Sequence, residues 1–543
     1  MKPFFKIIGS AWLVLALMAN GALAQSSTAA KGTAGGQNST VGRFSPDLPT
    51  TKTTGNVQVI VRYKVAPNNG HLQKITGLGG SVQLQMSKTK TAVFTVPAAV
   101  AKLLANLPDV AYVTPNRSLH AKLDMTAQAV HADVANNTNH VTGQGIGVAV
   151  IDSGIGNSPF FAAGQVVYHQ SFVGASAQYD DYGHGTHVAG IIASGGYGTV
   201  YKGMAPDVRL VDLRVLDANG SGTDAGVIQA IETAISLKTT YNIKVINLSL
   251  GRAPLEAAAD DPLCQAVEAA YQAGMVVVVS AGNEGRNNTS GIHGYGTIGS
   301  PGIDPYIITV GAMNTEGTST RTDDVMASYS SKGPTAFDHY VKPDLVAPGN
   351  HVASVLSGNP TLAQLYPQNK VAGNNDLFWL SGTSMSTPVV SGAAALLIQQ
   401  SPSITPDQVK FLLMKNASKT FPASSVAVDP STQTAYTIYS DIFTVGAGYL
   451  DITAALADNS RPTGAAVSPL ATLNANGTVS VTNVSGTQVI WGDQVIWGDQ
   501  VIWGDQVIWG DQVIWGDQVI WGDQVIWGDT MVSGDSIAIH GDR

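Results

Sequence analysis

Apolar and polar residues alternate near the start of the chain, most clearly in the run Val57-Gln-Val-Ile-Val61. A spacing of two residues is typical of a β-strand that buries one face. Residues 98–107 instead repeat their apolar positions at helical spacing, and residues 110–113 indicate a closing strand. The pattern predicts a small β-α-β-β-α-β, ferredoxin-like α+β domain over residues 56–122.

From Gly145 onward the pattern changes to short β-branched runs that are apolar on both faces. These runs are residues 146–151, 208–215, 244–250, 275–280 and 306–310. Helical spacing occupies the segments between them, notably residues 225–238 and 262–273. Buried strands that alternate with helices predict a parallel α/β sheet. We assign this α/β domain to residues 123–457.

The segments around these two domains have a different composition. Residues 25–55 and 458–487 are rich in Ser, Thr and Gly without periodicity, which predicts linkers. The last segment, residues 488–543, begins with seven tandem copies of Gln-Val-Ile-Trp-Gly-Asp, which end at Asp529. Strict tandem units favour a stacked β structure, and a low-complexity, aggregation-prone tail is the alternative. We expect removal of this segment to leave cleavage of small peptides unchanged, because no catalytic motif lies in it.

The first 24 residues have the composition of a bacterial-type secretory signal. Lys2 and Lys6 precede an apolar run over residues 7–19, and Ala22-Leu-Ala24 supplies small residues at a cleavage site. The apolar run is shorter than the roughly 20 residues that a membrane span needs. We therefore expect a secreted, extracellular protein without a membrane span, and an uncleaved anchor is the alternative.

Composition excludes several classes of protein. The 543 residues are 44% hydrophobic and 12% charged, which excludes disorder along the whole chain. A single cysteine, Cys264, excludes an internal disulfide framework and a thiolate metal cluster, and we expect it to be a buried structural thiol. The chain carries 29 basic and 38 acidic residues, so we expect no nucleic acid partner.

Four glycine-rich segments of the α/β domain each place a polar residue at a strand end or a helix start. The polar residues are Asp152, His184, Asn283 and Ser384. Taken singly, each is explained as a turn or cap residue, and Pro388 suits the first turn of the helix after Ser384. Taken together, an aspartate, a histidine and a serine in this order at one sheet edge match a known order of a serine-nucleophile triad.

With Asn247-Leu-Ser-Leu-Gly251 and the segment 342–349, these motifs make the chain resemble the subtilisin-like serine peptidases, the subtilases. The resemblance covers most of residues 123–457. It implies an endopeptidase that hydrolyses peptide bonds in proteins or peptides through an acyl-enzyme. Its nucleophile is Ser384, which needs the base His184, and Asp152 orients that base. Asn283 then donates a hydrogen bond to the oxyanion.

The same resemblance implies where substrate binds. In the family, an extended substrate adds as a strand between two enzyme segments. The matching segments here are Gly220-Ser221-Gly222 and Ser249-Leu250-Gly251. Gly299 matches the position that sets the depth of the pocket before the scissile bond, and a glycine there leaves room for large side chains. Broad cleavage after bulky residues is our interpretation, and a narrow processing peptidase is the alternative.

The small domain at residues 56–122 resembles the inhibitory prosegment of the same family. The resemblance implies a zymogen that cuts itself, and we expect the cut between His120 and Thr126, near Lys122, because residues 117–126 show no helical or strand period. No cofactor or metal is required for the chemistry. Structural calcium is unsupported, because Tyr197 stands in the loop that carries an Asn ligand in many subtilases. A surface binding or adhesive protein that works through its repeats is the competing function.

Overall fold

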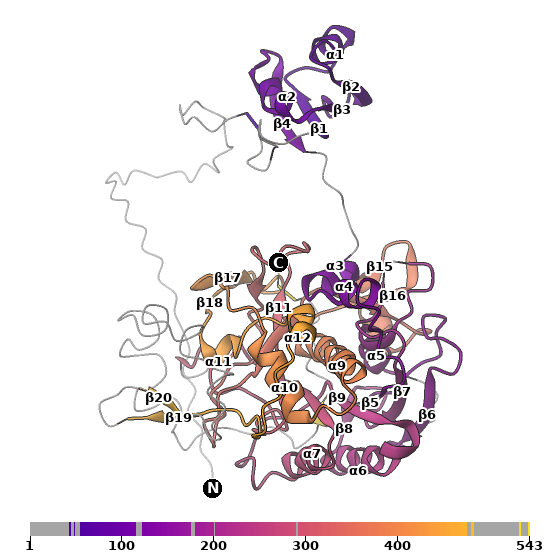
Figure 1. Ribbon diagram of the computed structural model, residues 1–543, viewed down its shortest axis with the longest axis vertical. Helices are drawn as coiled ribbons and strands as arrows, with labels where there is room; N and C mark the ends of the chain where they lie inside the picture. Colours follow the sequence, from indigo (N-terminus) through magenta and orange to yellow (C-terminus); the bar gives the residue numbers. More distant parts are fainter. Residues whose placement is uncertain are drawn as a thin grey trace, which may run out of the picture. The chain divides into compact units, whose positions relative to one another are not determined.

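The computed structural model describes residues 43–44, 48, 55–115, 122–174, 180–199, 201–288, 291–474, 479–482, 532–533 and 541–542. The chain divides into two compact units, Met1–Leu119 and His120–Arg543 (Figure 1). The expected signal peptide and the seven tandem repeats lie outside the described residues, as does nearly all of the linker expected at residues 25–55.

The first unit is a four-stranded antiparallel sheet with helices. Its elements are β1 (Asn56–Tyr63), α1 (Asn69–Thr76), β2 (Ser81–Met86), β3 (Thr91–Pro97), α2 (Ala98–Ala101) with a 3-10 turn (Lys102–Asn106), and β4 (Val110–Pro115). The sheet order is β2-β3-β1-β4. Val59 and Phe94 lie opposite each other in β1 and β3 and are buried with Ile75 of α1 and Leu104 of the 3-10 turn. The order of the elements is the one that the sequence period predicted.

Strand β2 differs from the simple alternation that its sequence suggests. Val82 and Leu84 are 39% and 54% exposed, although both are apolar. The register of β2 against β3 shifts between these two residues, and β2 lies at the edge of the sheet. The unit therefore leaves part of its apolar surface uncovered.

The second unit contains an eight-stranded sheet with the order β12-β11-β10-β9-β5-β7-β6, in which β13 also pairs with β11. Its strands are β5 (Gly147–Asp152), β6 (Val166–Ser171), β7 (Arg209–Arg214), β9 (Ile243–Leu248), β10 (Val276–Ser280), β11 (Ile308–Asn314), β12 (Val325–Met326) and β13 (Leu345–Pro348). Only the β11–β12 pair is antiparallel among the described strands of this sheet. The five predicted strands are all present, so the α/β prediction is confirmed.

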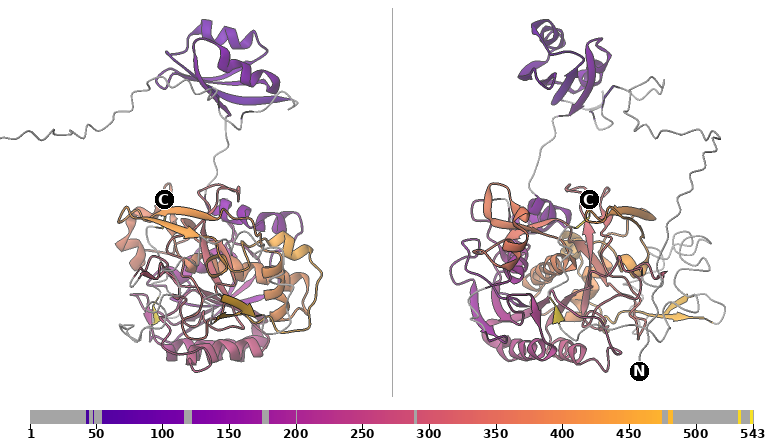
Figure 2. Two further views of the ribbon diagram at one scale, coloured as in Figure 1. Left: turned by 90° about the vertical axis from the view of Figure 1, so that its left-hand side faces the viewer. Right: turned by 180° about the vertical axis from the view of Figure 1, so that it is seen from behind.

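Helices cover both faces of this sheet (Figures 1 and 2). The helices are α3 (Lys122–Ala129), α4 (Ala132–Asn137), α5 (His184–Ala193), α6 (Asp224–Tyr241), α7 (Pro262–Gln272), α8 (Thr361–Leu365), α9 (Thr383–Gln400), α10 (Pro406–Lys415), α11 (Ile442–Val445) and α12 (Ile452–Ala457). Val148 and Val150 of β5 belong to the core that contains α5 and α9. Ala149 and Ile151 point into the core that contains α6 and α7. Successive residues of one strand therefore fill two cores, which explains its continuous apolar run.

Short strands complete the second unit. They are β8 (Ser221–Gly222), β14 (Val352–Val355), β15 (Lys370–Val371), β16 (Asn374–Leu380), β17 (Ser424–Val428), β18 (Ala435–Tyr439), β19 (Leu470–Leu473), β20 (Val479–Thr482) and β21 (Val532–Ser533). No helix of the described segments is long and apolar enough to cross a membrane.

Two predictions from the sequence are wrong in part, and the tail makes a contact that the sequence did not indicate. Residues 122–126, expected to be irregular, lie in helix α3. The linker expected at residues 458–487 includes the buried residues Ala466 and Ser468 and the β19–β20 hairpin. The C-terminal tail contributes β21, which pairs antiparallel with β8.

Candidate active site

Asp152 and His184 form a buried pair at the carboxyl end of the sheet. Asp152 is the last residue of β5, which lies between β7 and β9, and His184 is the first residue of α5. Nδ1 of His184 lies 2.8 Å from Oδ1 of Asp152, and both side chains are fully buried. Since a carboxylate only accepts, Nδ1 carries the proton, and Nε2 of the neutral ring is left to accept one.

The electrostatics of this pair suit a base. Burial by itself lowers the pKa of His184, but the charge and hydrogen bond of Asp152 outweigh it, so the pKa is raised above 6.5. Nε2 is buried and has no hydrogen-bond partner within the described residues. A buried polar atom without a partner is costly, which is typical of a site that completes itself with substrate.

His187, one turn further along α5, has a different environment. Its Nε2 donates to the carbonyl oxygens of Val352 and Phe378, at 3.2 and 2.9 Å. Burial lowers the pKa of His187 to about 3, so the ring stays neutral. His187 therefore holds α5 against β14 and β16 and is not a second base.

Asp180 is a positioning residue that the sequence reasoning missed. It accepts hydrogen bonds from the N–H groups of Gly183 and Thr186, at 2.7 and 2.8 Å, so it binds the start of α5. Its Oδ1 also accepts from the hydroxyl of Ser153, at 2.8 Å. One carboxylate thus ties the residue after Asp152 to the helix that begins with His184. The available signal was an acidic residue just before a helix start, where the helix dipole favours negative charge.

Ser384 is the second residue of α9, which begins at Thr383 after Gly382. Its hydroxyl donates to the carbonyl oxygen of Ser249, at 3.1 Å, and the hydroxyl of Ser249 donates back to the carbonyl of Ser384, at 2.9 Å. Pro388 lies inside the helix and not in its first turn, which corrects the expectation from the sequence. Because Pro388 has no N–H, the Ser384 carbonyl is left for Ser249.

The structure does not join all three candidate residues by hydrogen bonds. Asp152 and His184 are joined, whereas the Ser384 hydroxyl is bonded to Ser249 and not to His184 in the part of the chain that is described. Hydrogen bonds between catalytic groups often form only once substrate is bound. Helices α5 and α9, which carry the base and the serine, pack against each other in one core.

Asn283 follows β10 and faces the start of α9. Its Oδ1 accepts from the N–H and the hydroxyl of Thr383, at 3.0 and 3.2 Å, which orients the amide. Its Nδ2 is buried and has no partner among the described residues. The N–H of Ser384, the second residue of α9, lacks an acceptor within its helix. Two donors at this position suit a developing negative oxygen.

The residues expected to bind substrate lie after β9, in and beside β8, and at Gly299. Ser249, Leu250 and Gly251 come directly after β9, and the side chain of Leu250 lies in the core with α6 and α7. Gly220 has φ +76°, and a Cβ atom there would lie 2.5 Å from the ring of Tyr182. Gly299 donates its N–H to the carbonyl of Ala281 at 3.0 Å, so it lies beside the Asn283 segment. The edge of β8, with Ser221 and Gly222, pairs with the tail strand β21.

Tyr197 and Cys264 are two further residues that the sequence singled out. Tyr197 is 65% exposed. The described segments contain no group of three or more His, Cys, Asp or Glu side chains arranged to hold a metal ion. Cys264 is buried, as predicted, and burial raises the pKa of its thiol.

A buried Asp–His pair, a serine at the start of a helix and an oriented carboxamide define a class of enzyme, the serine peptidases. Residues 143–446 match the Subtilase family, which is more than half of the chain. The chain therefore belongs to the subtilase family and is a serine endopeptidase.

Two relatives that match by sequence agree with this assignment. Serine protease AprX of Bacillus subtilis (strain 168) is 39% identical over 336 residues, which cover 60% of this chain and 73% of the relative. Subtilisin E of the same strain is 34% identical over 348 residues, which cover 63% of this chain and 79% of the relative. Among solved structures, this chain matches the crystal structure of a cold adapted subtilisin-like serine proteinase, with 32% sequence identity and a TM-score of 0.39. The match covers 51% of this chain and 84% of the other chain.

Proposed function

We propose that this endopeptidase is secreted, is made as an autoprocessed zymogen, and uses Asp152, His184 and Ser384 as its catalytic triad. The observation that carries the triad is the 2.8 Å hydrogen bond between Asp152 and His184, which leaves Nε2 buried and unpaired in the described structure. A base in this state is ready to accept the proton of a serine hydroxyl. The family assignment supplies the class of reaction.

In the proposed mechanism, Ser384 Oγ attacks the carbonyl carbon of the scissile peptide bond while His184 Nε2 takes the hydroxyl proton. The carbonyl oxygen becomes an oxyanion, which accepts hydrogen bonds from Asn283 Nδ2 and the Ser384 N–H. The tetrahedral intermediate collapses to an acyl-enzyme when His184 gives the proton to the leaving amine. A water molecule, deprotonated by His184, then attacks the acyl-enzyme and releases the carboxylic acid product and Ser384. Asp152 stabilises the imidazolium of His184 during both acylation and deacylation.

We propose that substrate binds as an extended strand between residues 220–222 and 249–251. Residues 249–251 directly follow β9, and residues 221–222 form β8, whose partner strand is β21 of the tail, so a bound peptide would take the place of β21 beside β8. Gly299 is expected to form the base of the pocket before the scissile bond. A glycine there has no side chain to fill the pocket, which favours bulky residues and broad specificity.

We propose that the first unit is an intramolecular inhibitor of the peptidase. Three features support this role: its position before the peptidase domain, its β-α-β-β-α-β order, and its partly uncovered apolar surface at Val82 and Leu84. Because Lys122–Ala129 form a helix and a scissile peptide must be extended, we expect the cut at or just before Lys122. Export follows from the amino-terminal basic and apolar residues of the sequence.

Labelling with a fluorescent fluorophosphonate tests the triad. We expect the mature protein to form one adduct on Ser384, located by peptide mass spectrometry, and the Ser384→Ala variant to form none. The alternative is an adhesive protein whose peptidase domain is inactive. Absence of an adduct on folded, mature protein would refute the triad and leave that alternative standing.

A further inference from the structure

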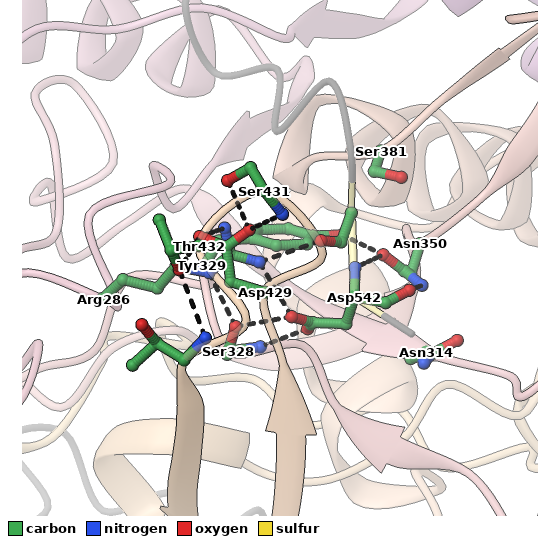
Figure 3. Close-up of polar contacts among 12 residues, drawn as sticks. Arg286, Asn314, Ser328, Tyr329, Asn350, Ser381, Asp429, Ser431, Thr432 and Asp542 are labelled. Carbon is green, nitrogen blue, oxygen red and sulfur yellow. Dashed lines mark hydrogen bonds and ion pairs between the residues drawn. The ribbon is translucent and has the colours of Figure 1, made fainter.

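The last described residues of the chain lie in a polar pocket of the second unit. We call it the C-terminal pocket and define it by Arg286, Ser328, Asn350 and Ser381 (Figure 3). It holds Gly541 and Asp542, and the side chain of Asp542 is fully buried. Buried aspartates are rare unless they are paired, so this contact needs an explanation.

The pocket satisfies the carboxylate of Asp542 with three donors. The N–H and the hydroxyl of Ser328 both donate to it at 2.6 Å, and Nη2 of Arg286 donates at 2.8 Å. Arg286 also donates to the carbonyl oxygen of Gly541, at 2.9 Å. Charge-assisted hydrogen bonds of this kind are stronger than neutral ones. An uncharged side chain of the same shape would replace them poorly.

Asn350 binds the main chain of Asp542. Its Oδ1 accepts from the N–H of Asp542 at 2.8 Å, and its Nδ2 donates to the carbonyl oxygen of Asp542 at 3.0 Å. One carboxamide therefore pairs with both polar groups of one peptide residue. This arrangement fixes where Asp542 sits and in which direction its chain runs.

The position before the aspartate accepts only glycine. Gly541 has φ +59°, a conformation that residues with a side chain rarely adopt. A Cβ atom there would lie 2.5 Å from the hydroxyl oxygen of Ser381 and closer still to Oδ1 of Asn350. Both atoms are held in place, since Ser381 accepts from the N–H of His351 at 2.9 Å and Oδ1 of Asn350 accepts from the N–H of Asp542 at 2.8 Å. The pocket therefore selects a glycine followed by an aspartate.

The walls of the pocket are held by contacts that do not involve the tail. Arg286 donates from Nε to the hydroxyl of Ser328 at 2.8 Å and pairs with Asp429 at 3.1 Å. Its guanidinium lies over the rings of Tyr329 and Tyr436, 5.6 and 5.8 Å from their centres. A guanidinium that is fixed on three sides is preorganised to bind a carboxylate.

Within the sequence, the dipeptide Gly-Asp occurs only in the C-terminal tail. Gly-Asp occurs nine times in the chain, and all nine copies lie after residue 491, in the tail. Seven of them end the tandem repeats. The pocket and its ligand are therefore encoded at separate positions, the pocket in the peptidase domain and the ligand in the tail.

We propose that the C-terminal pocket is a binding site for a Gly-Asp dipeptide, that Gly541–Asp542 of the same chain occupies it, and that it anchors the tail across the substrate-binding edge. The anchored tail also places Val532 and Ser533 antiparallel to Gly222 and Ser221 of β8. This second step rests on the proposed function, which assigns β8 to substrate. A tail held at both points competes with an extended substrate for the same backbone groups.

Hydrogen exchange in the full chain tests the pocket directly. The reporter is the amide of Ser328, which donates to Asp542, and the Ser384→Ala background prevents self-digestion. We expect Asp542→Asn and Gly541→Ala to raise the exchange rate of this amide at least about tenfold, because local protection is lost with the contact. The matched controls Asp535→Asn and Gly534→Ala change another Gly-Asp of the tail and should leave the rate unchanged. Unchanged protection in both test variants, or equal loss in the controls, would overturn the proposal.

A kinetic comparison in the chain with an intact Ser384 tests the competition. Because a tethered segment competes at a high effective concentration, we expect the KM for an extended peptide to fall about tenfold in Asp542→Asn and not in Asp535→Asn. An unchanged KM in an enzyme that cleaves the peptide would refute the competition and leave the proposed function standing. If no variant cleaves any peptide, the proposed function fails. The hydrogen exchange of the Ser328 amide would still show whether Gly541–Asp542 occupies the C-terminal pocket.

Discussion

Replacing Asn283 with leucine removes the proposed oxyanion donor, together with the acceptor that binds Thr383. Oδ1 of Asn283 binds Thr383 and only Nδ2 is left to meet the reacting oxygen, so the substitution removes one transition-state hydrogen bond. Loss of the corresponding donor in a subtilisin lowers kcat about 10²- to 10³-fold. At about 1.4 kcal/mol for each tenfold, that is roughly 3 to 4 kcal/mol of transition-state stabilisation. Leucine is close in size to asparagine but leaves the N–H and hydroxyl of Thr383 without this acceptor, so a variant that keeps the acceptor is needed to separate the two losses.

The assay is steady-state hydrolysis of an extended peptide, with active sites counted by fluorophosphonate titration. We expect kcat to fall by the amount above while KM changes less than about threefold, because the bond forms in the transition state and not in the ground state. Asn283→Asp is the matched variant. It keeps the acceptor that binds Thr383 and replaces the donor with a negative oxygen, so it should be at least as slow. A rise in KM at unchanged kcat would show that Asn283 binds substrate and does not stabilise the oxyanion.

The other predictions concern maturation, pH and specificity. Ser384→Ala should accumulate as a precursor that is uncut at Lys122, and N-terminal sequencing of a pure preparation that shows the wild-type cut would contradict self-processing. The acid limb of kcat/KM should lie above pH 6.5, because protonated His184 cannot act as a base and its pKa is raised. Asp152→Asn should lower kcat about 10⁴-fold and move this limb to lower pH, since burial then dominates the pKa of His184; an unmoved limb would assign it to another group. Gly299→Val should reduce the kcat/KM ratio of a phenylalanine over an alanine substrate about tenfold, and an unchanged ratio would place Gly299 outside the pocket.

Local sequence determined the secondary structure where the period was strong. The all-apolar run of β10 and the helical spacing of α6 appear in the structure within a few residues of their predicted bounds, because each needs only its own neighbours to define which face is buried. The motifs around Asp152, His184 and Ser384 were also readable, because each places a polar residue at a strand end or a helix start. Their chain order was enough to indicate a serine peptidase.

Only the tertiary structure decided the contacts between distant segments. Asp180 shows its role only once Ser153 and the start of α5 meet it, and Pro388 lies inside a helix because Ser249 satisfies the carbonyl that this proline leaves free. Asn350 and Asp542 are 192 residues apart, and no periodicity in either segment indicates that one binds the other. Such contacts depend on the shape and polarity that the folded sheet and its helices create together, which a one-dimensional pattern does not contain.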